Sequence, residues 1–368
     1  MWTQTDLTRR LELALPIVQG PFGSGLSAVD LVVEVSEAGG LGSFGVHHLE
    51  RADIRDVASA IRARTQRPFA MNLWIPLGDA DDPRIDDAAF ARAAESLGPY
   101  FRELNLPLPR RPERFAPPFD EQIEAIFEAR PAVFSFVFGI PAPAILARCR
   151  ELDIFTLGAA TTPDEAVALE RAGADAVVAT GLEAGGHRVS FLRPPEMSLM
   201  GTLSLVPQVV AAVTLPVIAA GGIADGRGLA AALTLGAQAA QIGTAFLGCD
   251  ESAASEIHRD KLHSSDARHT LLTRAASGRL ARGIENRFLL EMQQATHIAQ
   301  YPVQAWLTAR LKQAAIQQGR SDLLVLWCGQ SAPLLRHRKA RALMQDLRAQ
   351  ADAAFALRTV HEELRPSQ

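Results

Sequence analysis

The stretch that decides the fold runs Ala176-Val177-Val178-Ala179-Thr180-Gly181-Leu182-Glu183-Ala184-Gly185-Gly186-His187-Arg188. Its first four residues are an unbroken apolar run, which predicts a buried parallel strand. The glycines that follow allow a sharp turn and let a ligand approach the backbone closely. His187 sits at the tip of this turn, and its ordinary pKa of about 6.5 suits proton transfer near neutral pH. The stretch therefore predicts a strand that ends in a functional loop.

The same unit, a short apolar run followed by a turn and a helical segment, recurs along the first 250 residues. Eight runs of strand length occur, at residues 15–20, 41–45, 68–73, 132–136, 154–157, 176–179, 215–219 and 239–242. Ser27 and Thr162 are placed to cap the helices after two of the turns. This alternation predicts a parallel sheet with right-handed crossovers. Eight β/α units in about 250 residues match a (β/α)8 TIM barrel, an α/β fold.

Three parts of the chain do not follow this alternation. Residues 79–119, rich in Asp, Pro and Arg, are interpreted as an elaborated crossover with a helix over about 86–102. Its role is not decided by the sequence. We expect residues 1–250 to form the barrel and residues 251–329, where the strand signal is lost, to form a mostly helical extension over the active-site side. Residues 330–368 are expected to provide a C-terminal helix, about 333–357, that packs back on the barrel.

Composition narrows the class of protein. The 368 residues are 48% hydrophobic, their formal net charge is -4, and no basic stripe is present, so we expect no nucleic-acid partner. No apolar run is long enough to span a bilayer and the N-terminus does not resemble a signal peptide, so we expect no membrane association and a cytoplasmic location. The three cysteines lie far apart and no metal-ligand spacing occurs, which predicts no metal site. A homodimer is left open.

Small residues follow the last two predicted strands. They are Ala219-Ala220-Gly221-Gly222-Ile223 after the seventh strand and Gln241-Ile242-Gly243-Thr244 at the end of the eighth. Residues of this kind leave backbone N–H groups accessible, and the loops after strands seven and eight are the usual phosphate site of a TIM barrel. We therefore predict phosphate binding here, although the glycines alone would also be explained by tight turns.

Flavin mononucleotide (FMN) fits a phosphate site beside an open barrel mouth, although another phosphorylated ligand is not excluded. Asn72, at the end of the third strand, can offer an amide to the ring, and Gly20 and Gly23 let the backbone come close. His187 is the candidate catalytic group; a solvated loop histidine or a phosphate contact is the alternative. Arg188 and Arg279 could bind an anionic substrate. Ser24 and Ser277 have no neighbouring base in the sequence, so a hydrolase triad has no support.

Taken together, these motifs resemble the nitronate monooxygenase family over nearly the whole chain. The matching segments are 16–21, 38–42, 181–188, 216–228, 241–247, 277–279 and 281–283. The long segment 216–228 together with the segment around His187 is specific for this family and its near relatives. Phe22 stands where many relatives have Met, Val189 where they have Gly, and Thr180 where they often have Gln.

The resemblance implies an FMN-dependent oxidoreductase. Such an enzyme oxidises alkyl nitronates, for example propionate 3-nitronate, with O2, giving a carbonyl compound and nitrite or nitrate in a detoxification reaction. His187 is then the catalytic base. The expected cofactor-binding residues are Gln19, Gly20, Asn72, Thr180, Gly185, Gly186, Gly221, Gly222, Gln241, Gly243 and Thr244.

Two other functions fit the same motifs. Related barrels that pass hydride from NAD(P)H through a flavin to quinones or enoyl thioesters carry the same Glu-Ala-Gly-Gly-His turn, here residues 183–187. A protein that only binds a flavin or a phosphate is the other alternative. Reduction of the flavin by NADH, or the absence of any turnover, separates these functions from nitronate oxidation.

Overall fold

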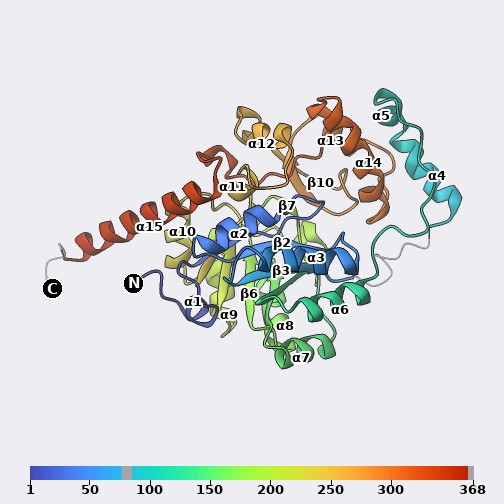
Figure 1. The fold of residues 1–368 in the computed structure, drawn as a ribbon. Helices are drawn as coiled ribbons and strands as arrows, with labels where there is room; N and C mark the ends of the chain where they lie inside the picture. Colours follow the sequence, from blue (N-terminus) through green and yellow to red (C-terminus); the bar gives the residue numbers. More distant parts are fainter. Residues whose placement is uncertain (77–84, 364–368) are drawn as a thin grey trace.

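The centre of the protein is a parallel eight-stranded sheet, shown in the computed structural model, which describes residues 1–76 and 85–363 (Figure 1). The strands lie side by side in the order β1-β9-β8-β6-β5-β4-β3-β2. Their bounds are β1 (Ile17–Gln19), β2 (Gly42–Gly45), β3 (Phe69–Trp74), β4 (Val133–Val137), β5 (Phe155–Ala160), β6 (Ala176–Thr180), β8 (Val217–Ala220) and β9 (Ala239–Ile242). Each corresponds to one of the eight predicted runs.

The two ends of this sheet meet, which makes it a barrel. Val18 of β1 forms a parallel bridge with Leu41, the residue before β2. The Gln19 amide donates to the Leu41 carbonyl at 2.9 Å, and the Leu41 amide donates to the Ile17 carbonyl at 2.9 Å. Helices lie between successive strands around the outside (Figure 1). The predicted (β/α)8 TIM barrel is thus confirmed.

The outer helices begin and end for local reasons. They are α2 (Val29–Glu37), α3 (Arg51–Arg62), α6 (Phe119–Ala129), α7 (Pro143–Glu151), α8 (Pro163–Ala172), α9 (Thr202–Ala212) and α10 (Gly226–Thr234), with a short α1 (Asp6–Arg10) before β1. Thr162 caps α8 by accepting from the Glu165 amide, as predicted, and Gly173 ends it at φ +87°. Ser27 does not cap α2. Its hydroxyl instead accepts from the Phe22 and Gly45 amides, which fixes the loop after β1.

The described part of the predicted crossover 79–119, which starts at Ile85, contains two helices rather than one. They are α4 (Asp87–Ser96) and α5 (Gly98–Glu103), separated at Leu97 because Pro99 starts a new first turn. Both lie beside the C-terminal helices, away from the barrel (Figure 1). The Phe90 ring is 5.8 Å from the Trp306 ring, and the Tyr100 hydroxyl donates to Glu291 at 2.9 Å. Residues 79–84 of this predicted segment lie outside the described residues.

The part after the barrel contains helices and, contrary to expectation, strands. After α11 (Thr244–Leu247), which follows β9 directly, the helices are α12 (Glu256–Leu262), α13 (Arg287–Gln293) and α14 (Val303–Gln317). A small antiparallel sheet joins β10 (Thr270–Thr273), β11 (Ala281–Ile284) and β7 (Gly186–His187). β7 was missed because its partner β11 lies about 95 residues later in the chain, and β10 and β11 were missed because each is only four residues long. This sheet attaches the His187 loop to the C-terminal part.

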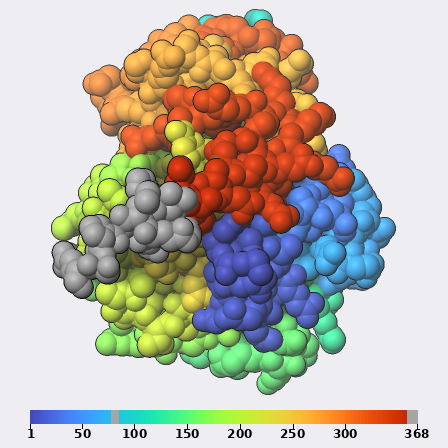
Figure 2. All heavy atoms as spheres, turned by 90° about the vertical axis from the view of Figure 1, so that its left-hand side faces the viewer, coloured from blue at the N-terminus to red at the C-terminus, as the bar shows by residue number. Residues whose placement is uncertain are grey.

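The last helix, α15 (Ala340–Glu363), begins seven residues after the predicted start because Pro333 belongs to a one-turn helix, Ala332–Leu334. It lies against α10 and the N-terminal segment: Gln350 accepts from the Gly226 amide at 3.1 Å, and Asp352 accepts from the Trp2 indole at 2.7 Å. Figure 2 shows the red C-terminal segment directly against the blue N-terminal one. None of the helices within the described ranges is long and apolar enough to cross a membrane.

Candidate active site

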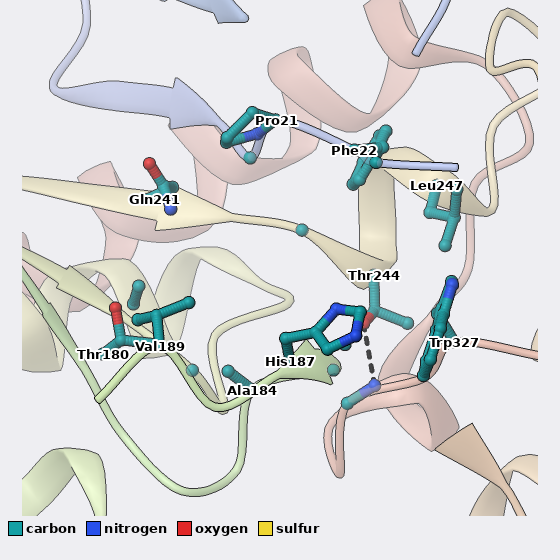
Figure 3. A pocket seen from close by; sticks show the side chains of 18 of the residues that line it. Pro21, Phe22, Thr180, Ala184, His187, Val189, Gln241, Thr244, Leu247 and Trp327 are labelled. Atoms are coloured by element: carbon teal, nitrogen blue, oxygen red, sulfur yellow. Dashed lines mark hydrogen bonds between the residues drawn. The ribbon is translucent and has the colours of Figure 1, made fainter. Parts of the chain in front are cut away.

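A cavity opens at the carboxyl ends of the barrel strands, where TIM barrels place their active sites (Figure 3). Its wall includes every predicted catalytic and cofactor-binding residue except Gln19. These residues are Gly20, Asn72, Thr180, Gly185, Gly186, His187, Gly221, Gly222, Gln241, Gly243 and Thr244. Phe22 and Val189, the two departures from the family pattern, also line it. The barrel thus brings together residues that are up to 224 positions apart in the chain.

Gln19 does not line the cavity. Its side chain is fully buried, and its amide nitrogen donates to the Gly20 carbonyl. Its amide oxygen accepts from the Ser43 amide at 2.9 Å. Both ends of the side chain are therefore used to hold the loop after β1 against β2, which indicates a supporting role.

The loop after β8 needs glycine for conformational and steric reasons. Gly221 has φ +100° and Gly222 has φ +73°, a region that other residues rarely adopt. A Cβ atom on Gly221 would lie 3.0 Å from the Gly181 carbonyl oxygen. With hydrogens in place of side chains, the backbone itself forms the wall of the cavity here.

The opposite side of the cavity is completed by the C-terminal part of the chain. Thr244 Oγ1 accepts from the Gly329 amide at 2.9 Å, the bond drawn in Figure 3. The Glu183 carbonyl accepts from the Gln330 amide at 2.9 Å, so the loop after β6 is fixed to the same segment. Trp327 and Cys328 line the cavity beside these contacts. Residues beyond the barrel are therefore part of the site.

His187 projects into the cavity from β7 (Figure 3). Its position is fixed by pairing with Ala281 in β11 and by a 2.7 Å hydrogen bond between its Nε2 atom and the Ser277 hydroxyl. The Trp74 ring lies 4.9 Å away, edge to face, and the Trp327 ring 5.1 Å away. All four of these residues lie far from His187 in the sequence. Trp74 alone left a signal, since it follows Asn72 by two positions and so shares its face of β3.

Burial lowers the pKa of His187 to about 3, and the nearby Arg279 guanidinium adds to this effect. His187 is therefore neutral at physiological pH and able to accept a proton. When Nε2 carries the hydrogen, it donates to Ser277 Oγ, whose own hydrogen can be donated to the Arg279 carbonyl at 3.3 Å. No described residue hydrogen-bonds the Nδ1 atom. In this tautomer Nδ1 is the nitrogen available as a base.

The two arginines considered as substrate ligands have different environments. Arg188 is 1% exposed and donates to three backbone carbonyls, those of Gly181 at 2.6 Å and of Thr180 and Ser198 at 3.1 Å. It is occupied in holding the loop after β6 and does not bind substrate. Arg279 lies over the rings of Tyr301 and Phe138, 4.0 and 4.1 Å from their centroids, close to the site.

Replacing Arg188 with Met is expected to lower the free energy of unfolding by about 3 kcal/mol, because buried carbonyls would lose charged donors. Urea denaturation monitored by circular dichroism measures this change. Arg193→Met, at an exposed position five residues along, is the matched control. Equal stability of the two variants would contradict the supporting role of Arg188.

Gly185 and Gly186 offer a test of the cavity wall. A Cβ atom on Gly185 would lie 2.6 Å from the Cys328 carbonyl carbon and from the Gly329 nitrogen, both backbone atoms. A Cβ atom on Gly186 would meet nothing within 4 Å, although its φ is +76°. We expect Gly185→Ala to cost about 3 kcal/mol of stability through overpacking and Gly186→Ala about 1 kcal/mol through its backbone. Thermal unfolding measures both variants. If Gly186→Ala lost more stability than Gly185→Ala, the close packing of Gly185 against Cys328 and Gly329 would be contradicted.

Comparisons with known proteins identify the family to which the chain is similar. The model of the nitronate monooxygenase family matches residues 4–350. A protein of Staphylococcus aureus strain Newman named "Probable nitronate monooxygenase" is 40% identical over 349 residues, which is 94% of this chain and 97% of the relative. The structure of nitroalkane oxidase from Streptomyces ansochromogenes superposes with a TM-score of 0.85 at 36% identity, covering 96% of this chain and 99% of that one. FabK from Thermotoga maritima gives 0.74 at 28% identity, with 97% and 99% covered.

Proposed function

Because the chain belongs to the nitronate monooxygenase family, we propose that it uses FMN and O2 to oxidise alkyl nitronates of the propionate 3-nitronate type. The products are a carbonyl compound and nitrite or nitrate. The observation that carries this proposal is the position of His187, a neutral base in a cavity walled by the glycines after β6 and β8. The protein is an oxidoreductase. Its site suits a substrate whose reacting carbon is a carbanion or becomes one when a proton is removed.

The residues present fit FMN. Gly221, Gly222, Gly243 and Thr244 would hold the phosphate through backbone groups that no side chain covers. The side chains of Asn72 and Gln241 would meet the polar edge of the ring, with Gly20, Thr180, Gly185 and Gly186 in the walls around it. When bound, FMN supplies the electron acceptor that passes electrons to O2.

His187 and its neighbours would remove a proton from the substrate, orient it and exclude water. With a neutral nitroalkane as substrate, the free Nδ1 of His187 would remove the α-proton, and Ser277 would hold the imidazole in the required tautomer. With a preformed nitronate no proton needs to be removed, and His187 orients the anion. Trp74 and Trp327 exclude water from the side of the imidazole.

The first test is an absorbance spectrum of the purified protein together with an oxygen-uptake assay on propionate 3-nitronate. A yellow protein that consumes O2 with this substrate is the expected result. A colourless protein that does not take up added FMN would overturn the proposal. Rapid anaerobic bleaching of the flavin by NADH, without nitronate turnover, would instead favour the flavin reductase that acts on quinones or enoyl thioesters.

A further inference from the structure

The guanidinium group of Arg279 is held between aromatic rings beside the active site. Its Cζ atom is 4.0 Å from the centre of the Tyr301 ring and 4.1 Å from that of the Phe138 ring, with the Trp74 ring at 5.7 Å. Rings attract a cation placed over their faces, most strongly where water is excluded, and Arg279 is only 9% exposed. Phe138 and Trp74 line the active-site cavity, whereas Arg279 lines a neighbouring cavity. Arg279 can therefore influence the reaction through its neighbours without touching the substrate.

Phe138 holds its ring against Arg279 at a conformational cost. It directly follows β4 and has φ +69°, a left-handed conformation that a bulky residue rarely adopts. Its side chain is buried, and its ring also lies edge to face with that of Trp74, with 5.0 Å between the centroids. Backbone strain of this kind persists only where the surrounding structure requires it, and it is concentrated at functional sites. The strain at Phe138 indicates that the position of this ring matters to the site.

Both main-chain polar groups of Arg279 bond to the hydroxyl of Ser277. The Arg279 amide donates to Ser277 Oγ at 3.3 Å, and the hydroxyl donates its hydrogen to the Arg279 carbonyl at 3.3 Å. A hydroxyl has one hydrogen and two lone pairs, so a single lone pair remains. The remaining neighbour is His187 Nε2, at 2.7 Å. Because the hydroxyl has no hydrogen left to donate, Nε2 has to be the donor, and the tautomer with a bare Nδ1 is selected.

The turn that carries these bonds is packed closely on the segment that carries Tyr301. Gly278 has φ +85°, and a Cβ atom there would lie 2.4 Å from the Tyr301 nitrogen and 2.5 Å from the Ala299 carbonyl oxygen. On the other side of Ser277, the Thr308 hydroxyl donates to the Ala276 carbonyl at 2.8 Å. The turn is thus fixed before Ser277 by a hydrogen bond and after it by the aromatic clamp on the Arg279 side chain.

We propose that Arg279 is a positioning residue: clamped between Phe138 and Tyr301, it orients the Ser277 hydroxyl so that His187 keeps its hydrogen on Nε2 and presents a bare Nδ1 to the substrate. This inference deepens the proposed function and rests on it, because it assigns His187 the work of a base. The same guanidinium adds to burial in keeping the pKa of His187 low, so Nδ1 also stays unprotonated.

Nitrogen-15 NMR of the histidine side chains tests this inference, because the two ring nitrogens of a neutral imidazole differ according to which one carries the hydrogen. The intact protein should show His187 as a single Nε2–H tautomer, assigned by its loss in His187→Asn. Arg279→Met should give a mixture of tautomers, whereas Arg279→Lys, which keeps a cation between the rings, should restore most of the Nε2–H form. Arg268→Met, at an exposed position, is the control and should change nothing. An unchanged His187 tautomer in Arg279→Met would overturn the inference.

Kinetics tests the route by which Arg279 acts. Arg279→Met is expected to lower kcat/KM for nitroethane about tenfold and that for ethyl nitronate by less than about twofold, the scale of a residue that orients another. In a Ser277→Ala background the same substitution should have little further effect, because the residue through which it acts is gone. Additive losses would contradict the route through Ser277.

The two measurements separate this inference from the proposed function. If the protein oxidises no nitronate but the tautomer of His187 still depends on Arg279, the proposed function fails and the positioning role stands. If nitronates are oxidised but the tautomer is the same with and without Arg279, the positioning role is wrong and the proposed function stands.

Discussion

Replacement of His187 by Asn is expected to lower kcat/KM for nitroethane by a factor of about 10²–10⁴, the usual contribution of a general base. The same substitution should have a much smaller effect on ethyl nitronate, from which the α-proton has already been removed. The reason lies in the geometry: one nitrogen of His187 is held by Ser277 at 2.7 Å, and the other has no partner among the described residues. The variant loses the base but keeps the walls of the cavity.

Steady-state oxygen uptake with the two substrates measures this difference, and the ratio of the two effects is the decisive quantity. A shared loss caused by misfolding or weak cofactor binding would lower both rates equally and leave the ratio unchanged. Equal losses on nitroethane and ethyl nitronate would therefore remove His187 from proton abstraction. Because the pKa of His187 is about 3, its protonation should not limit activity between pH 6 and 8.

The role of Ser277 can be tested through His187. Ser277→Ala removes the partner that fixes the imidazole tautomer, so we expect a loss on nitroethane smaller than that of His187→Asn and little change on ethyl nitronate. Ser277 had been considered in the sequence only as a nucleophile without a base. In the structure Ser277 hydrogen-bonds His187, which lies 90 residues earlier in the chain.

The barrel was predictable from local patterns because each of its strands is a short apolar run followed by a turn. The cavity was predictable for the same reason, since strand ends converge at one face of a barrel. Asn72, Thr180, Gly221 and Gln241 could all be placed there by counting strands. The actual role of Gln19 could not, because the direction of its side chain depends on contacts with Gly20 and Ser43.

The remainder of the site depends on contacts between distant segments. The pairing of His187 with Ala281 joins β7 to β11, which also pairs with β10, yet neither two-residue β7 nor four-residue β11 stands out as a strand in the sequence. Trp327, Cys328 and Gly329 reach the cavity from beyond the barrel. Such residues become visible only when the C-terminal part is folded over the strand ends (Figure 1).

Acid is expected to destabilise the protein strongly between pH 7 and pH 5. Burial lowers the pKa of four histidines: His187 to about 3, His48 and His258 to about 4, and His47 well below its ordinary value. The Nδ1 atoms of His47 and His48 are buried without a hydrogen-bond partner, so a proton added there would find no acceptor. These side chains remain neutral in the native state while they become charged in the unfolded chain.

The sign of the effect follows from proton uptake. Below about pH 6.5 the unfolded chain binds protons at these four positions and the native protein does not, so stability falls as pH falls. Each histidine contributes about 2 kcal/mol between pH 7 and pH 5. Together they remove about 8 kcal/mol, which is comparable with the total stability of an ordinary domain. The loss stops only when the native histidines themselves begin to bind protons, near pH 4 and below.

Urea denaturation at pH 7, 6 and 5 measures this dependence. His258→Gln removes one of the four groups, so whatever it costs at pH 7, it should reduce the loss between pH 7 and pH 5 by about 2 kcal/mol. The same substitution at the exposed His269 is the control. A free energy of unfolding that is equal at pH 5 and pH 7 would show that the buried histidines accept protons in the native state. The neutral imidazole assigned to His187 would then be wrong too, because its neutrality has the same cause, burial beside a cation.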